Sequence, residues 1–323
     1  MTDTRPARTP REQWTYVFKG ADGLRAGWSM LLFVALVALF AVVLVGVATA
    51  LHLAITPKPG VPQAPAATIA MEAASFAIVG LAALLVALVE RRPFARYGLR
   101  RARCFPDLFK GMAWGVAMLS LLVGLLTLSG ALVFDGVALA APDALGYGAA
   151  WFVGFCLVGL FEEFLTRGFL QYTLARGVAG IVGAVAPGNA HARTIGFWVA
   201  AAVFSVGLFA IGHVGNAGET AMGLVSVAVA GLTFVYVLYR TGSLWWGIGF
   251  HATWDFMQSF VYGVRDSGLA IQGHLLVSHP AGAPILSGGA TGPEGSVLVV
   301  PTLLLTLFVI HRTLPRRETA FDS

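Results

Sequence analysis

Charge and cysteine are both scarce in this sequence, and each shortage narrows what the protein can be. Asp, Glu, Lys and Arg make up 11% of the 323 residues, whereas apolar residues make up 57%, and a water-soluble domain carries far more charge. The two cysteines, Cys104 and Cys156, lie beside a basic segment and inside an apolar run. That placement argues against a disulfide or a cysteine metal site. The composition predicts an integral membrane protein.

Two common hydrolase motifs are also missing. The sequence has no Gly-x-Ser-x-Gly segment, which would present a nucleophilic serine, and no His-Glu-x-x-His segment, which would hold zinc on a helix. Cys156 has no evident neighbour that would stabilise a thiolate. The sequence therefore gives no support to a serine or cysteine nucleophile.

Long apolar runs are what the sequence does have, and they predict an all-α, polytopic membrane bundle. Several reach the roughly 18 to 20 residues that cross a hydrocarbon core. We expect one membrane domain at 27–313, after a mobile arm at 1–26 and before a tail at 314–323. Its eight helices are expected at about 27–54, 66–89, 108–134, 147–173, 195–214, 219–239, 243–263 and 296–312.

The distribution of arginine predicts the orientation of this bundle. Three lysines stand against eighteen arginines, and the arginines gather in the arm, the tail and alternate loops. Because Lys and Arg in short loops favour the cytoplasm, we expect both termini there and a long outer loop at about 265–295. The excess of arginine over lysine and the abundance of Ala and Gly are typical of a bacterial protein. We therefore expect the protein to lie in a bacterial plasma membrane. The segment 177–186 is too short to span, and is expected to lie at the interface or to re-enter the membrane.

Ionisable residues inside the apolar runs are the candidate functional residues, because charge at bilayer depth is costly and usually functional. Glu163 and Arg167 have the i, i+4 spacing of a helical ion pair. Glu162 points about 100° away from Glu163 around the helix, so we expect it to have a different role from the ion pair. Glu72, in the second run, is either a cavity residue or a helix-pairing group.

Two further helices supply the other candidates. His213 ends the fifth run, and His251 and Asp255 share one face of the seventh. Hydrolysis of a peptide bond needs a base, a proton donor for the leaving amine, and donors for the oxyanion. Glu162 suits the base, His213 a water-orienting or proton-carrying group, and His251 the oxyanion donor. Asp255 would fix the position of His251 or donate a proton itself.

At these residues the sequence resembles the CAAX-protease and bacteriocin-processing (CPBP) family, which includes the Ras-converting CAAX-box endopeptidases. The family pattern is Glu-Glu-x-x-x-Arg, then Phe-x-x-x-His, then His-x-x-x-Asn/Asp, and this chain matches each in order. The matching residues are Glu162, Glu163, Arg167, Phe209, His213, His251 and Asp255. The resemblance covers about 145–312 and implies an intramembrane endopeptidase with a glutamate-activated water and an oxyanion site made by His251 and Asp255. It implies a membrane-embedded or lipidated peptide or protein as substrate. No nucleic-acid partner is expected, because the arginines cluster in short segments beside apolar runs rather than along one polar face.

The family is commonly labelled a metalloprotease, and Glu/His clusters suit Zn²⁺. If a metal is present, Glu162, His213 and His251 are the expected ligands, but the sequence leaves the requirement open. Two other functions stay open as well. One is a non-catalytic bacteriocin self-immunity or scaffold protein of the same fold, and the other is a proton-coupled transporter.

One expectation conflicts with catalysis. In straight helices with the bounds given above, Glu162 and His213 would lie at different depths in the membrane. A shared cavity requires either tilted helices, different helix ends, or a re-entrant segment.

Overall fold

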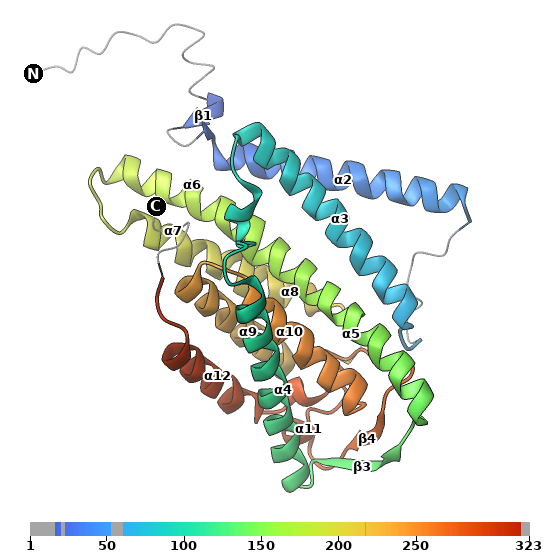
Figure 1. Ribbon diagram of the computed structural model, residues 1–323. Helices are drawn as coiled ribbons and strands as arrows, with labels where there is room; N and C mark the ends of the chain where they lie inside the picture. The colour runs from blue at the N-terminus through green and yellow to red at the C-terminus, as the bar shows by residue number, and fades with distance from the viewer. Residues whose placement is uncertain (1–16, 21–22, 53–60, 217, 318–323) are drawn as a thin grey trace, which may run out of the picture.

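The computed structural model describes residues 17–20, 23–52, 61–216 and 218–317. These residues form a bundle of long helices that run side by side, with a short strand pair at each end (Figure 1). Most of the expected arm at 1–26 and part of the expected tail at 314–323 lie outside the described residues. The all-α class is confirmed.

The helical elements follow one another with few irregular connections. They are α2 (Ala26–Ala50), α3 (Pro65–Glu90), η1 (Phe94–Tyr97), α4 (Cys104–Leu128), α5 (Ala141–Glu163), η2 (Phe164–Leu170), α6 (Gln171–Val185), α7 (Ala192–Ala200), η3 (Ala201–Leu208), α8 (Phe209–His213), α9 (Ala221–Thr241), α10 (Trp245–Asp255), η4 (Phe256–Val261), α11 (Pro284–Ser287), η5 (Pro293–Gly295) and α12 (Val299–Thr313). The segments η2, η3 and η4 are π-helical and continue the α-helices around them.

Six of the described helices are long and apolar enough to cross a membrane. They are α2, α3, α4, the continuous helix α5–η2–α6, the continuous helix α7–η3–α8, and α9. The remaining two of the eight expected runs form α10–η4 and α12, which are shorter. The polytopic bundle is therefore confirmed, and the count of eight spans stays a prediction.

Two short strand pairs were not expected. β1 (Lys19–Gly20) pairs with β2 (Gly23–Leu24), and β3 (Leu132–Val137) pairs antiparallel with β4 (Leu276–Pro280). The helix expected at 108–134 in fact ends at Leu128, because Gly130 has a φ of +72° and the amide of Ala131 bonds back to the carbonyl of Leu126. This is the hydrogen bond of a Schellman-type helix end. The apolar residues beyond it enter β3.

The segment 177–186 neither turns back nor breaks the helix. It extends α5 and η2 into one helix of 45 residues, roughly 68 Å long. Its last part, α6, packs against α7 in a helical hairpin (Figure 1). Gly196 of α7 lies so close to the backbone of Ala175 that any larger residue would clash. The re-entrant alternative is therefore wrong.

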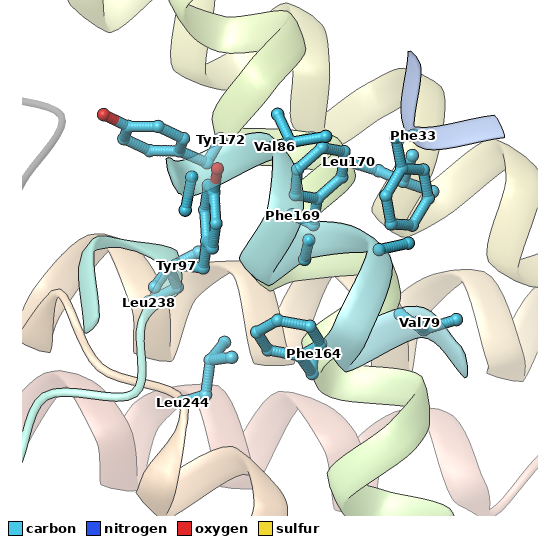
Figure 2. Close-up of a cluster of buried hydrophobic side chains, with 14 of the residues drawn as sticks. Phe33, Val79, Val86, Tyr97, Phe164, Phe169, Leu170, Tyr172, Leu238 and Leu244 are labelled. Carbon is cyan, nitrogen blue, oxygen red and sulfur yellow. The ribbon is translucent and has the colours of Figure 1, made fainter. Parts of the chain in front are cut away.

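An aromatic cluster holds η2 in place. Phe169 stacks on Phe33 of α2 with ring centroids 4.0 Å apart, and the edge of Tyr97 from η1 meets Phe169 at 5.0 Å. Figure 2 shows Phe164, Phe169 and Leu170 among side chains from α2, α3 and η1. Burial of such large side chains contributes about 1.5–3 kcal/mol each. The cluster fixes one side of η2, and the ionisable residues lie on the other.

Glycines let α10 approach α4 closely. A Cβ at Gly111 would collide with the carbonyl oxygen of Trp246, and one at Gly249 would collide with that of Leu108. Small residues at such contacts are typical of membrane helices, whose association depends on close packing. The depth and rotation of α10, which carries His251 and Asp255, are set by this contact.

Candidate active site

The paired glutamates of α5 have separate surroundings, as their 100° offset predicts. The Glu163 carboxylate accepts a hydrogen bond from the Arg167 guanidinium at 2.7 Å, and the two residues are 1% and 0% exposed. The expected ion pair is therefore present. Glu162 is only partly buried and faces a cavity. The sequence thus provides one carboxylate held by a cation and a second one that opens onto the cavity.

Arg167 also connects the first motif to the second. Its guanidinium donates to the backbone carbonyl of Ser205 at 3.3 Å and lies 4.1 Å from the ring centre of Phe209. Phe209 is the first residue of the Phe-x-x-x-His motif. A guanidinium over an aromatic ring is an attractive arrangement, particularly when desolvated. The arginine therefore holds the helix of His213 against the helix of the glutamates.

His251 lies at the centre of the charged groups. Its Nδ1 is 3.1 Å from Glu163 Oε1, while its Nε2 is 3.5 Å from Asp255 Oδ2 and 3.8 Å from Glu162 Oε2. Its ring stacks on Phe234 with centroids 5.3 Å apart. If His251 Nδ1 donates its hydrogen to Glu163, a hydrogen bond between Nε2 and the carboxyl group of Asp255 or Glu162 requires a further proton, either on Nε2 or on that carboxyl group. The arrangement can thus hold one proton at either position.

His213 has one ring nitrogen committed to the backbone. Its Nδ1 lies 2.8 Å from the carbonyl oxygen of Phe209. Because a carbonyl only accepts, Nδ1 must carry the hydrogen, and in a neutral imidazole this leaves Nε2 as an acceptor. His213 lines the same cavity as Glu162. Its free nitrogen can therefore accept a proton from water or from a substrate group.

One cavity of about 270 Å³ is lined by Glu162, His213, His251 and Asp255. The sequence predicts that Glu162 and His213 lie at different depths. In the structure this difference disappears, because α6 continues to Val185 before the chain turns. Measured from that turn, Glu162 lies about 35 Å along the α5–η2–α6 helix, and His213 lies about 32 Å along the α7–η3–α8 helix. The two antiparallel helices therefore carry them at nearly the same level.

Other cavity residues were missed or left open by sequence reasoning. Glu72 of α3 lines the cavity, which decides between the two alternatives given for it. Asp266, Glu294 and Ser259 line it too. Asp266 and Glu294 belong to the loop expected at 265–295. Asp266 gave no signal in the sequence, and Glu294 was not assigned a role. Glu294 is held by the amide and hydroxyl of Ser267, at 3.1 and 2.7 Å.

The described residues show no preformed zinc site. Among the described residues, no three His, Cys, Asp or Glu side chains are arranged to hold a metal. Nδ1 of His251 faces Glu163, its Nε2 faces Asp255 and Glu162, and Nδ1 of His213 is bonded to the backbone. Structural and catalytic zinc sites both need at least three converging protein ligands.

The comparisons with known proteins agree with the motifs. Residues 144–257 match the family model of the Rce1-like type II CAAX prenyl endopeptidases. This region contains all the motif residues named above, so the expected resemblance is confirmed there. The match ends at Met257, and its expected extension to residue 312 stays a prediction. No curated protein and no solved structure matches the chain.

The six candidate spans indicate an integral membrane protein, and residues 144–257 of it are similar to the Rce1-like type II CAAX prenyl endopeptidases.

Proposed function

We propose that this protein is an intramembrane endopeptidase in which Glu162 activates water without a metal. The observation that carries the proposal is the convergence of three motif helices on one cavity within the matched region. The substrate is a membrane-embedded or lipidated peptide or protein, which reaches the cavity from the bilayer. The protein is oriented with both termini in the cytoplasm, as the arginine distribution predicts.

The first step is attack by water. Glu162 takes a proton from a water molecule, and the hydroxyl oxygen bonds to the carbonyl carbon of the scissile peptide. His213 accepts a hydrogen bond from the same water through Nε2 and directs it. The carbonyl oxygen becomes an oxyanion, which accepts a hydrogen bond from His251 Nε2–H. Such a preorganised donor is usually worth about 10²–10³ in rate.

The second step is collapse of the tetrahedral intermediate. The proton held by Glu162 passes to the leaving nitrogen, directly or through His213, and the C–N bond breaks. The products are a carboxylic acid and an amine, so water is the only co-reactant. Asp255 positions His251, while Glu163 and Arg167 position it from the other side. Neither Glu163 nor Arg167 touches the substrate.

The test compares purified wild type with Glu162→Gln and His213→Ala in detergent. The substrates are a library of hydrophobic peptides and of peptides with a farnesylated cysteine, each assayed with and without a chelator. His191→Ala is the matched control, since the structure places His191 in the connection before α7, well away from the cavity. We expect cleavage by wild type and His191→Ala, loss of at least about 10² in kcat for Glu162→Gln, and no effect of the chelator.

Each contrary result has a distinct meaning. Cleavage that survives in folded Glu162→Gln and His213→Ala would make these motifs structural. Cleavage abolished by the chelator and restored by zinc would overturn the metal-free mechanism. Absence of all cleavage, with substrate-driven proton uptake in proteoliposomes, would favour a transporter that uses the same carboxylates and imidazoles.

A further inference from the structure

The cavity contains more carboxyl groups than the proposed hydrolysis uses. Five carboxylates line it, from Glu72, Glu162, Asp255, Asp266 and Glu294, and no Lys or Arg of the described chain does. Glu162 and Asp255 belong to the proposed mechanism, and Glu294 is held by Ser267 and by the indole of Trp254 at 3.2 Å. Glu72 and Asp266 are left without such a role.

Glu72 has no cationic partner among the residues that the structure describes. It lies on α3, outside the region that matches the family model. Its Oε2 is fully buried and makes no hydrogen bond, and the charged group that acts on it is another carboxylate, Glu162. A buried charge or polar group without a partner is costly. A ligand that donates hydrogen bonds to this carboxylate would remove the cost.

Asp266 has the same unbalanced surroundings. Burial raises the pKa of its carboxyl group well above the usual range, and Asp255, Glu294, Glu162 and Glu219 raise it further. Among the described residues, Asp266 itself forms no ion pair with a cation. A positive group entering the cavity would meet an attractive field from several directions.

Glu72 and Asp266 belong to walls that are tied together. The amide of Gln63, just before α3, donates to the carbonyl of Ala270 at 2.9 Å, and the amide of Gln272 donates to the carbonyl of Gln63 at 2.8 Å. These bonds fasten the start of α3 to the loop that carries Asp266. The two carboxylates therefore face the cavity from connected elements and are not brought there by chance contacts of mobile side chains.

A buried hydroxyl gives an independent sign that a ligand belongs in this place. Ser259 of η4 is 2% exposed, its Oγ has no hydrogen-bond partner, and it lines the same cavity as the carboxylates. Buried hydroxyls in folded proteins are nearly always paired. A polar ligand in the cavity would supply the missing partner.

We propose that Glu72 and Asp266 select substrates that carry a positively charged side chain, or a free amine, close to the scissile bond. This inference rests on the proposed function, because it names the substrate class of that cavity. Arginine and lysine side chains fit it best, since charge-assisted hydrogen bonds to carboxylates are the strong ones. The cavity of about 270 Å³ has room for such a side chain, as it equals roughly nine water volumes.

The test measures charge preference by turnover. Each library peptide is made as a pair with arginine or the neutral isostere citrulline at one position, and the position is moved along the peptide. We expect wild type to prefer arginine at one position by at least about tenfold in kcat/KM. Glu72→Gln and Asp266→Asn are each expected to bring this ratio down toward one.

Asp143→Asn is the matched control, because it removes a carboxylate at the outer end of α5 that does not line the cavity. It should keep the wild-type ratio. Should Glu72→Gln fail to fold, Asp266→Asn, in a loop, still decides the question. A wild-type ratio near one at every position, or a ratio that both substitutions leave unchanged, would overturn the proposal.

A second measurement separates this proposal from the proposed function. If wild type cleaves no peptide, the endopeptidase function fails, and equilibrium binding of the same arginine and citrulline peptides is measured on the purified protein. About tenfold tighter binding of the arginine peptide, lost in Glu72→Gln and Asp266→Asn, would support cation selection alone. Equal binding would reject it.

Discussion

Removing Arg167 should destabilise the protein far more than removing the whole ion pair to which it belongs. Arg167 and Glu163 are 0% and 1% exposed and 2.7 Å apart, so water does not screen them. Arg167→Met leaves a buried carboxylate without its cation, which typically costs about 3–5 kcal/mol. In the double variant Glu163→Met, Arg167→Met, two apolar side chains of similar volume replace the pair. Such replacements are often close to neutral, so most of the loss should be recovered.

Activity should not follow stability in this series. In the double variant His251 Nδ1 loses its acceptor, Glu163 Oε1, although the helices remain packed. The proposed mechanism then expects turnover to stay low in both variants. A protein whose pair only connects helices would recover turnover together with stability.

The assay is reversible unfolding in mixed micelles, with the fraction of SDS raised and the eight tryptophans as the fluorescent signal. Free energies extrapolated to zero SDS give the coupling between the two positions. We expect a coupling of at least about 2 kcal/mol. A double variant that is as unstable as the sum of the two single variants would refute the argument from burial.

Three further predictions concern packing, charge and orientation. Gly111→Ala should lower the free energy of unfolding by about 1–3 kcal/mol, because the added Cβ would collide with the backbone of α10. Gly124→Ala should leave the free energy of unfolding unchanged, because open space surrounds this position. Unfolding in mixed micelles measures both variants. Asp266→Asn should be more stable than wild type at pH 8 but not at pH 4. Because the pKa of Asp266 is raised in the native state, the wild type loses stability as the pH rises above the pKa of the unfolded state, about 3.9. An equal difference in stability between the two proteins at pH 4 and at pH 8 would contradict this prediction. In a cysteine-free background, an impermeant maleimide should label Ile285→Cys but not Arg101→Cys in intact cells, and the reverse pattern would invert the predicted orientation.

The local features of the site could be predicted from the sequence because they depend on spacing within single helices. The ion pair of Glu163 and Arg167, and the contact of His251 with Asp255, both follow from the i, i+4 rule. The different surroundings of Glu162 and Glu163 follow from the 100° step between neighbours. None of these required knowledge of which helices touch.

Features that depend on tertiary packing could not be predicted in this way. Gly177, Gly180 and Gly183 weaken the intrinsic preference of α6 for a helix, by roughly 1 kcal/mol each relative to Ala. The helix continues nevertheless, because α6 packs on α7 and α2. The shared level of Glu162 and His213 depends on that continuation. Asp266 could not be recognised either, since only the folded loop brings it to the cavity.

The π-helical segments beside the motifs have a consequence for how the site can be dissected. In a π-helical turn each amide donates to the carbonyl five residues earlier, so some backbone carbonyls remain available to other donors. Ser205, within η3, gives its carbonyl oxygen to Arg167 at 3.3 Å, and the carbonyl of Glu162, just before η2, accepts from Thr166 Oγ1 at 2.6 Å. Part of the polar framework is thus main chain. Side-chain substitution cannot delete these acceptors, whereas shortening η3 by one residue would rotate His213 relative to the glutamates and change the framework in a single step.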